Sequence, residues 1–379
     1  MVRAQDREEL LSALQLARTE GVGPMTFTGL LARQGSTAAA LRLVREKPAP
    51  DGSARRVPDR GTLLAELDAL AAWDAVVLAK TMAGYPRPLR ELADGPPILT
   101  VRGDAALLHR PGVALVGARN ASANGCAFAR RLARELAEAG LVVVSGLARG
   151  IDTAAHEGAL AATGATVAVI AAGVDVVYPP ENADLMARIA REGAVISERP
   201  LGAQARAKDF PRRNRIIAGL SLGVVVVEAA PASGSLITAR LALDYGREVM
   251  AVPGSPQDPR HRGTNQLLRD GAHLVESAAD VLAILAPLRD RLEPPSVRSM
   301  RLPRAPGPAP ERPAVGRPKP SGPVQERVLA ALGPVPLAVD ELIRECAAPA
   351  PDVQAALLEL ELAGRIDRQP GNRVCLRAD

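Results

Sequence analysis

The sequence predicts an α/β protein built on a doubly wound, mostly parallel sheet. Short apolar runs without polar alternation recur between residues 112 and 275, as expected of strands that are buried on both faces. Segments of roughly 10–15 residues with helical periodicity separate these runs, which is typical of βαβ units. Helical segments precede this region and a small separate domain follows it, so we expect three structured parts.

Composition limits the alternatives. The chain has 379 residues, enough for two or three domains, and 2% aromatic residues, so its core must consist of Ala, Val, Leu and Ile. The N-terminus has no apolar signal-peptide core, and no stretch of about 18 residues lacks charged or polar breaks, which predicts a cytoplasmic protein without a membrane segment. Three cysteines lie far apart and fit no metal-binding spacing: Cys126, Cys346 and Cys375.

The net charge of +5 at pH 7 is unevenly distributed. Residues 289–322 carry eight basic and three acidic side chains, a net charge of +5. The rest of the chain is therefore neutral overall. A surface for an anionic partner has to come from local clustering of basic residues.

Residues 1–60 are predicted to form a helical module of the helix-hairpin-helix or SAM-like type. Apolar residues at helical spacing run through 7–45, interrupted by Gly21-Val22-Gly23. Such a break resembles a helix-hairpin-helix turn, whose backbone amides can bind a phosphate at the next helix N-terminus. An ordinary helical hairpin fits the same residues, and the sequence does not decide between them.

Residues 61–288 are predicted to form the central domain. After a mixed segment that contains Trp73, strands and helices alternate. Strands are predicted within 112–119, 141–152, 165–173, 194–198, 222–230, 247–254 and 272–277. Helices are predicted within 125–140, 153–164, 177–193, 235–246 and 264–271.

The C-terminal part is predicted to be a linker and a winged helix. Residues 289–322 hold nine prolines and form the linker, and residues 323–379 contain three helices and a β-hairpin. Asp352 is the candidate N-cap of the third helix. That helix also carries Glu359 and Glu361 and has no basic residue before Gly364, so phosphates would repel it from a DNA groove. We expect this domain to contact protein.

Small residues with backbone amides follow several predicted strands, next to helix N-termini. In doubly wound sheets ligands bind at this carboxyl edge, where amides and helix dipoles favour anions. The turns are "VGARNAS", "SGLARGID", "ASGSLIT" and "VPG", and two of them contain an arginine. They predict a site for a polyanion or nucleotide at Gly117, Arg119, Ser122, Ser145, Gly146, Arg149, Gly150, Ser233, Gly234, Ser235 and Thr238.

The stretch "DFPRRNRIIAGLS", residues 209–221, places Arg212, Arg213 and Arg215 just before a buried strand. The three guanidiniums can cap a helix and form surface ion pairs, or they can hold an anionic ligand at the sheet edge. The residues alone leave both interpretations open.

The common nucleotide and hydrolase signatures are absent from the sequence. There is no G-x-x-x-x-G-K-[ST], and the first loop lacks G-x-G-x-x-G, which disfavours NTP hydrolysis and dinucleotide binding. The Ser145 and Ser235 loops are not G-x-S-x-G elbows. Asp152 and His156 at i and i+4 could form a catalytic or metal pair, but Asp152 is more simply the N-cap of its helix. We therefore predict no catalytic residue, metal or cofactor.

From about residue 70 to 287 the chain resembles the DNA-processing protein A family, also called DprA or Smf. The likeness is carried by several motifs in the same order: "GYPRPLRELADGPPIL", "VGARNAS", "SGLARGIDTAAHEGAL", "AGVDVVYPPENADL", "SERPLG", "FPRRNRIIAGLS", "VVVEAAPASGSLITARLALDYGREVMAVPG" and "GTNQLLRDGA". The helical module and the winged helix resemble the two ends of family members.

The resemblance implies a Rossmann-like domain that binds single-stranded DNA, usually as a homodimer. Family members load the recombinase RecA onto single strands, including strands covered by single-strand-binding protein, during transformation. Arg119 matches an arginine implicated in DNA contact, "SGLARG" and "SGSLIT" match phosphate-contacting turns, and "FPRRNR", with Asn214, matches the basic motif beside them. Pro180-Glu181 and Ala230-Pro231 stand where some members have basic residues, which implies a less basic groove.

The resemblance also suggests a role for the arginine-rich stretch. Arg212, Arg213 and Arg215 would form one wall of a sugar–phosphate groove, and Phe210 or Tyr178 would stack on a base. Contacts made mainly to phosphate tolerate most sequences and weaken steeply with salt.

Two other functions remain open. The first is a nucleotide-cleaving enzyme of the phosphoribohydrolase type, whose P-G-G-x-G-T signature would fall near 231–238. Ala232 and Ser235 stand there in place of glycines, which argues against that chemistry. The second is a scaffold that recruits partners through the winged helix and the linker.

Overall fold

The computed structural model describes residues 4–46, 55–292, 323–332, 337–346, 348–363, 365–369 and 373–376. The chain forms two compact units, Met1–Ser296 and Val297–Asp379, and each is described by itself. Within the described part, no helix is both long and apolar enough to cross a bilayer.

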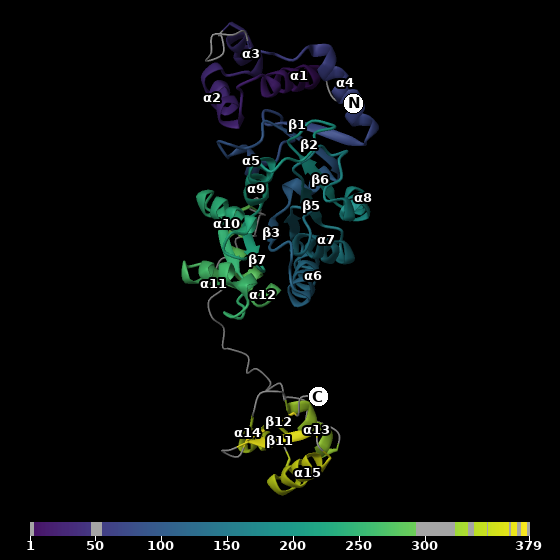
Figure 1. The fold of residues 1–379 in the computed structure, drawn as a ribbon, viewed down its shortest axis with the longest axis vertical. Helices are drawn as coiled ribbons and strands as arrows, with labels where there is room; N and C mark the ends of the chain where they lie inside the picture. The colour runs from purple at the N-terminus through teal and green to yellow at the C-terminus, as the bar shows by residue number, and fades with distance from the viewer. Residues whose placement is uncertain are drawn as a thin grey trace, which may run out of the picture. The chain divides into compact units, whose positions relative to one another are not determined.

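The N-terminal helices pack on one edge of the sheet in the first unit (Figure 1). Gly21, with φ +77°, makes the turn between the first two helices, because a left-handed backbone favours glycine. Leu14 and Phe27 are buried together with Leu63 and with Ile98 of the sheet. The helices are α1 (Ala4–Arg18), α2 (Pro24–Gln34), α3 (Thr37–Glu46) and α4 (Arg60–Ala72). The predicted boundary after residue 60 falls at the start of α4, and the limits of the domains stay a prediction.

The sheet of this unit has nine strands in the order β1-β2-β6-β5-β4-β3-β7-β8-β9. The strands are β1 (Ala75–Ala79), β2 (Ile98–Gly103), β3 (Gly112–Val116), β4 (Val142–Ser145), β5 (Thr166–Val169), β6 (Ala194–Ser197), β7 (Gly223–Val226), β8 (Glu248–Ala251) and β9 (His273–Leu274). Strands β3 to β9 are parallel to their neighbours in this set, whereas β1 and β2 are antiparallel. Strand order reverses between β3 and β7, which makes this the topological switch point where doubly wound folds bind ligands.

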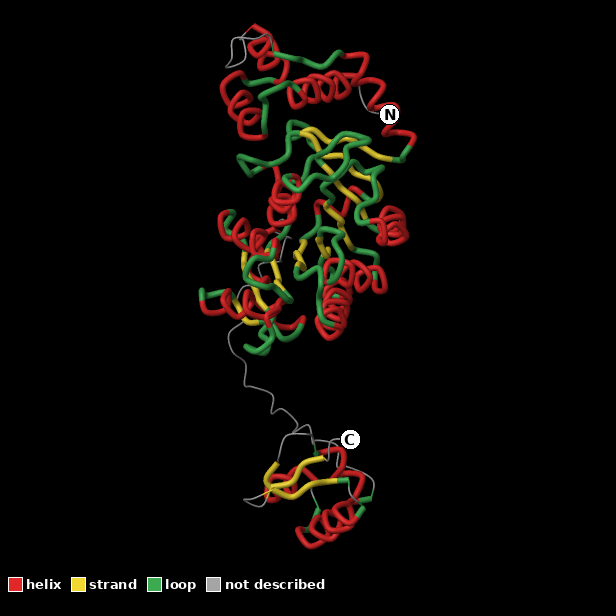
Figure 2. Tube along the Cα trace, in the orientation of Figure 1, coloured by secondary structure: helices red, strands yellow, loops and turns green. Residues whose placement is uncertain are grey.

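Helices cover both faces of the parallel strands, which confirms the predicted doubly wound fold (Figures 1 and 2). In β3, Val113 and Leu115 pack toward α6 and α7, while Ala114 and Val116 pack toward α9 and α10. This alternation buries both faces of an apolar strand. The helices of this region are α5 (Arg87–Arg90), α6 (Ala123–Glu138), α7 (Ile151–Ala162), α8 (Ala183–Glu192), α9 (Asp209–Leu220), α10 (Gly234–Asp244), α11 (Arg262–Arg269) and α12 (Ala278–Leu292), with 3-10 turns η1 (Ala105–His109), η2 (Pro180–Asn182) and η3 (Pro259–His261).

Three elements differ from the prediction. The arginine-rich stretch, residues 209–221, was assigned no element, and it contains the whole of helix α9. Strands β1 and β2 form in the segment around Trp73, where the sequence showed no clear pattern. β1 was hard to recognise because it is an edge strand with mixed burial. Helix α12 ends at Leu292, so the first residues of the predicted linker are helical, and residues 293–322 lie outside the described part.

The second unit has the predicted winged-helix architecture. Its helices are α13 (Val324–Ala331), α14 (Val339–Cys346) and α15 (Ala350–Leu362), and its antiparallel strands are β10 (Leu337–Ala338), β11 (Ile366–Gln369) and β12 (Arg373–Leu376), in the order β10-β12-β11. Asp352 was predicted to cap α15, and this was wrong. The N-cap is Pro349, and Asp352 lies in the first turn, where a negative charge favours the positive end of the helix dipole.

Candidate functional site

A cavity of about 510 Å³ opens at the switch point between β3 and β7. We call it the switch-point cavity. Its lining comes from residues 116–120 after β3, from the first two turns of α9, and from residues 230–238 leading into α10. Ala148, Asp152 and Arg260 complete it. The cavity therefore joins three of the segments that the sequence singled out separately.

Arg119 and Phe210 form a ridge at the edge of this cavity. The Arg119 guanidinium carbon lies 5.2 Å from the centroid of the Phe210 ring, and the ring of Tyr178 lies 5.5 Å from the same ring. Tyr178 is 47% exposed, so much of the residue can be reached from solvent. A second cleft, which we call the Tyr178 cleft, also contacts Arg119 and Phe210 and continues along the loop 146–149. The ridge therefore separates two recesses at the sheet edge.

Arg213 lines both recesses and is almost fully buried, with 5% of its surface exposed. Its Nε and Nη1 atoms have no hydrogen-bond partner among the described residues. Burial lowers the pKa of the guanidinium to about 10; the Asp152 carboxylate opposes this shift and Arg119 adds to it. A buried guanidinium with two unpaired nitrogen atoms is rare in proteins and needs an explanation.

Asp152 shapes the loop after β4. Its carboxylate accepts hydrogen bonds from the N–H groups of Gly146 at 3.1 Å and Ala148 at 3.4 Å. Burial raises the pKa of Asp152, and Arg213 and these N–H groups oppose that shift. The prediction that Asp152 caps α7 was wrong: the N-cap is Gly150, and Asp152 lies one residue inside the helix. Gly150 has φ +75°, and a Cβ there would stand 2.3 Å from the Ala118 oxygen.

His156 does not pair with Asp152. Its Nδ1 lies 2.8 Å from the Thr166 hydroxyl, and the side chain is fully buried. Burial lowers the pKa of His156 to about 3, so the ring is neutral in the folded protein at neutral pH. The described residues contain no group of three His, Cys, Asp or Glu side chains that could hold a metal ion.

Helix α10 begins at the cavity. Ser233 is its N-cap, and the Ser233 hydroxyl accepts a hydrogen bond from Ser235 N at 3.4 Å. Asn214 of α9 donates to the Gly234 carbonyl at 3.3 Å and so ties the two helices together. Thr238, one turn on, is buried and lines the same cavity. The positive end of the α10 dipole therefore points at the space in front of Arg213.

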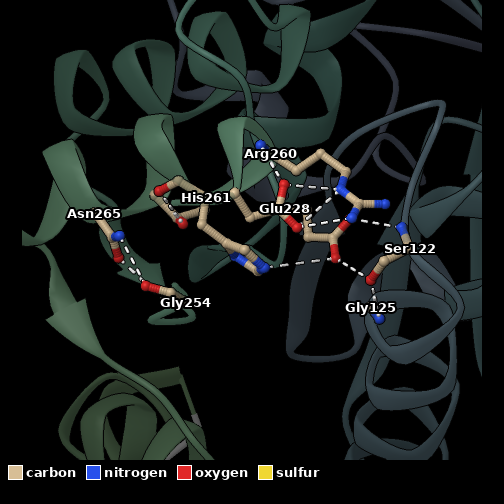
Figure 3. A network of polar contacts seen from close by, with 9 residues as sticks. Ser122, Gly125, Glu228, Gly254, Arg260, His261 and Asn265 are labelled. Atoms are coloured by element: carbon tan, nitrogen blue, oxygen red, sulfur yellow. Dashed lines mark hydrogen bonds and ion pairs between the residues drawn. The ribbon is translucent and has the colours of Figure 1, made fainter. Parts of the chain in front are cut away.

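Ser122 was predicted to face an anion, but Glu228 already occupies the N-terminus of α6 (Figure 3). The Ser122 N–H and hydroxyl both donate to the Glu228 carboxylate, the backbone bond measuring 2.9 Å. Glu228 is 1% exposed, and its Oε1 lies 3.8 Å from His261 Nε2. A Cβ on Gly125 would stand 2.4 Å from Oε1, which explains the glycine there.

Sequence reasoning missed Glu228. The only available signal was an acidic residue at the end of the apolar run "VVVVEAA". Arg260 was missed too: it lines the switch-point cavity and forms an ion pair with Asp258 at 2.7 Å.

Six other predicted residues lie outside the switch-point cavity: Ser145, Gly146, Arg149, Gly150, Arg212 and Arg215. Arg215 bonds to Glu198 and to the Asp94 carbonyl, the latter at 2.6 Å. It therefore ties α9 to the segments that carry these two residues. Arg212 is exposed on α9 and lines neither recess. The Ser145 hydroxyl donates to the Leu115 carbonyl at 2.6 Å. Arg149 lines the Tyr178 cleft.

Glu181 limits the charge of that cleft. Its carboxylate lies 3.4 Å from Arg149 Nε, and both side chains are largely exposed. An ion pair of this kind screens the arginine only in part. Glu181 therefore lowers the positive charge available to an anion beside Tyr178.

Family models match all three structured parts of the chain. The model described as DNA recombination-mediator protein A matches residues 76–286. The model described as a DprA-like N-terminal HHH domain matches residues 7–69, and that described as the DprA winged helix domain matches residues 308–372.

Individual proteins and structures agree with these models. The chain is 38% identical to Protein Smf of Synechocystis sp. over 312 residues, covering 76% of this chain and 77% of that protein. It is 48% identical to the DNA processing protein DprA of Streptococcus pneumoniae over 199 residues, covering 52% and 70% of the two chains.

Two solved structures are also similar. The X-ray structure of DprA from Streptococcus pneumoniae has a TM-score of 0.58 and 34% identity, covering 73% of this chain and 96% of that one. DNA processing protein A from Helicobacter pylori, described for its single-stranded DNA binding mode, has a TM-score of 0.52 and 31% identity, covering 57% and 97%. The chain therefore belongs to the DNA recombination-mediator protein A family, known as DprA or Smf.

Proposed function

We propose that this protein binds single-stranded DNA across the carboxyl edge of its sheet and presents the strand to the recombinase RecA. The observation that carries the proposal is the meeting of Arg119, Arg213 and the N-terminus of α10 in one cavity, beside the exposed ring of Tyr178. Cationic groups and backbone amides bind phosphates, and exposed rings stack on unpaired bases. The description of the Helicobacter pylori relative, which names a single-stranded DNA binding mode, supports the same function.

The ridge of Arg119 and Phe210 gives the proposed binding mode its geometry. A strand that crosses the ridge places a phosphate in the switch-point cavity and a base near Phe210 or Tyr178. Bases in a duplex are stacked on one another and cannot use these rings, so single strands are preferred. Glycines 117, 146 and 234 line the recesses. Of the three, only Gly234 has open space where a Cβ would stand, so the backbone there can approach a phosphate closely.

Fluorescence anisotropy with a labelled strand of ~30 nucleotides tests this proposal at several salt concentrations. We expect tight binding by the wild type, little competition from duplex, and a steep loss of affinity with salt. Arg119→Ala and Arg213→Ala together should abolish binding. Arg188→Ala, a change of the same charge on α8, is the control and should bind normally. Unchanged affinity in the double variant would refute the site.

Delivery to RecA is the second part of the proposal. In the cytoplasm, incoming strands become covered by single-strand-binding protein, and a mediator must hold the strand while RecA replaces that cover. RecA ATP hydrolysis on strands coated with single-strand-binding protein would measure this activity. The wild-type protein should shorten the lag, and Arg119→Ala should not. An equal lag with and without the protein would leave DNA binding as its only activity.

We propose that the protein acts as a homodimer. Strand β9 ends the sheet, Leu274 on it is 52% exposed, and Leu243 on α10 is 61% exposed. An apolar sheet edge is a surface that a second copy can cover. Light scattering should give twice the chain mass, and Leu274→Glu should reduce the mass to that of one chain.

The winged helix is proposed to contact protein. Asp352, Glu359 and Glu361 are exposed on α15, as is Leu358 at 54%. This acidic and apolar face suits a protein partner better than a phosphate backbone. Deletion of residues 293–379, which leaves α12 complete, should therefore weaken stimulation of RecA while single-strand affinity stays unchanged.

We propose that the protein works by binding and not by cleaving nucleotides. Incubation with nucleoside monophosphates, monitored for released base, separates this function from the phosphoribohydrolase alternative. Ala232 and Ser235 line the cavity in place of the glycines of that enzyme signature, so we expect no release.

A further inference from the structure

We propose that a cavity at the amino edge of the sheet is a docking site for a short acidic peptide of a partner protein. The cavity, which we call the amino-edge cavity, has a volume of about 340 Å³ and lies at the starts of β3, β7 and β8. The switch-point cavity lies at the carboxyl ends of β3 and β7. The inference is independent of the proposed function, because the two sites are at opposite edges of the sheet.

Segments that are far apart in the chain build the amino-edge cavity. Helices α5 and α9 lie side by side (Figure 1), and the cavity is lined by α5 and by the end of α9. The end of η1, the first residue of β3 and the residue before β8 complete the lining. The core of the first unit therefore holds the cavity in place.

Arginines outnumber carboxylates in this lining. Among the described residues that line the cavity, Glu91 is the only acidic one, and it accepts a hydrogen bond of 2.7 Å from Arg87. Arg110 donates to the Gly140 carbonyl at 3.2 Å, and both Arg110 and His109 beside it are exposed. Because a guanidinium has five N–H donors, Arg110 keeps donors for an anion.

Arg247 is the half-buried cation of the cavity. Its Nη2 donates to the Gly219 carbonyl at 3.2 Å, and its Nε is buried without a hydrogen-bond partner among the described residues. Burial lowers the pKa of Arg247, and the Glu91 carboxylate opposes that shift. A carboxylate in the cavity would give such a guanidinium the acceptor with which it pairs best.

Apolar side chains form much of the remaining lining. Pro88 and Pro111 are half-buried, and Leu220 and Leu222 are buried. Pockets of roughly 300–1,000 Å³ with an apolar lining and a few polar groups are typical ligand sites. A ligand for the amino-edge cavity therefore needs an apolar group beside its negative charge.

The surroundings favour a peptide over a nucleic acid. No aromatic ring lines the cavity among the described residues, so a base finds no ring to stack on. Leu220 and the C-cap Ser221 bring the negative end of the α9 dipole to the cavity, which is unfavourable for a phosphate. Carbonyls of a last helical turn accept N–H groups, which a peptide backbone has and a sugar–phosphate backbone lacks. Carboxylates, an apolar side chain and backbone N–H groups together describe an acidic peptide.

The experiment is selection of random short peptides, displayed on phage, against the immobilised full chain. An excess of oligothymidine occupies the strand site during selection. We expect the enriched peptides to carry several Asp or Glu residues next to a large apolar residue, and a labelled synthetic copy measures the affinity by fluorescence anisotropy. Enriched peptides without acidic residues, or no enrichment over an unrelated protein, would overturn the docking site.

Variants locate the bound peptide. Arg110→Glu combined with Arg247→Met removes the two cations that have donors to spare and should weaken peptide binding by roughly tenfold or more. Arg188→Glu, on the exposed face of α8, is the control and should keep the wild-type affinity. Thermal unfolding shows whether the double variant is folded, and Arg110→Glu alone, a change of an exposed residue, replaces it if it is not. Equal peptide affinity in the wild type and in the folded variant overturns the proposal.

Oligothymidine distinguishes the two edges of the sheet. The peptide should stay bound when oligothymidine saturates the strand site, and Arg119→Ala should leave peptide affinity unchanged. Displacement of the peptide, or loss of its binding in Arg119→Ala, would place it on the strand site and overturn the inference. Failure of the wild type to bind oligothymidine would overturn the proposed function alone.

Discussion

The guanidinium of Arg213 lies directly against Gly146, so that a Cβ built on this glycine would stand only 1.4 Å from Arg213 Nη1. Gly146 follows β4, whereas Arg213 lies on α9, far along the chain. The glycine is needed there for close approach and not for a left-handed backbone. Two motifs that are separate in the sequence thus form one structural unit beneath the ridge of Arg119 and Phe210.

Gly146→Ala should therefore displace Arg213. We expect a loss of about 1–3 kcal/mol in the free energy of unfolding, because overpacking of a filled site forces neighbours to move. Single-strand affinity should fall as it does in Arg213→Ala. Urea unfolding and fluorescence anisotropy measure the two effects. Gly29→Ala is the matched control, since no atom lies within 4 Å of a Cβ on Gly29 and alanine favours its helix. Wild-type affinity in Gly146→Ala would contradict the close contact.

Phe210→Ala and Arg119→Ala should weaken DNA binding in different ways. Loss of the Phe210 ring removes stacking worth about 1–3 kcal/mol per base and leaves the salt dependence unchanged. Loss of Arg119 removes a phosphate contact and should lower the slope of log affinity against log salt by roughly 1. Anisotropy titrations over a salt series give both quantities. The same slope in both variants would show that Arg119 acts through Phe210 and not on phosphate.

Ser122→Ala and Glu228→Gln should each destabilise the protein, and their effects should be coupled. Ser122→Ala removes the hydroxyl bond to Glu228 and keeps the backbone one, and Glu228→Gln replaces the carboxylate by a neutral amide. Each change alone should cost about 1–3 kcal/mol in the free energy of unfolding. The double variant should cost less than the sum, with a coupling of roughly 0.5–3 kcal/mol. Ser36→Ala removes a serine bonded to Ala39 N without a buried carboxylate and is the control. Because the Ser122 donors are already bonded to Glu228, Ser122 makes no phosphate contact. The salt dependence of DNA binding in Ser122→Ala should therefore equal that of the wild type.

His156 should make the protein less stable as the pH falls. In the unfolded chain the ring gains a proton near pH 6.5, whereas its pKa is lowered to about 3 in the folded state. The unfolded state therefore binds one more proton between these values, and the free energy of unfolding falls by up to ~1.4 kcal/mol per pH unit as the pH decreases through that window.

His156→Gln, which can still bond to Thr166, should remove this part of the pH dependence. Urea unfolding of both proteins at a series of pH values from about 7 to 5 tests it. The free energy of the wild type should decline more steeply than that of the variant. Parallel curves would mean that the ring accepts a proton in the folded state.

Much of the fold was predictable because it depends on local patterns. The apolar strands β3 to β9 and the helices between them follow from hydrophobic periodicity, and parallel order follows from their alternation. Helix α9 was not predicted because its first two turns are crowded with charges, and β1 was not predicted because an edge strand has mixed burial. The misassigned caps, Asp152 and Asp352, lie two and three residues after the true N-caps of their helices, and side chain type alone does not locate a helix end to within that distance.

The sequence predicted which segments meet at the site, but it did not predict which partner each side chain has there. Sequence spacing placed glycine-rich turns and arginines at the carboxyl ends of neighbouring strands, because parallel strands bring these ends to one edge. Only the packing of α9 against β4 and α10 decided that Arg213 enters the cavity while Arg215 turns to Glu198 and Arg212 stays in solvent. Likewise, Ser122 bonds to Glu228 only because the tertiary structure brings the end of β7 beside the start of α6. Local order is encoded in neighbouring residues, whereas the partner of a buried charge is set by which distant segments the core brings together.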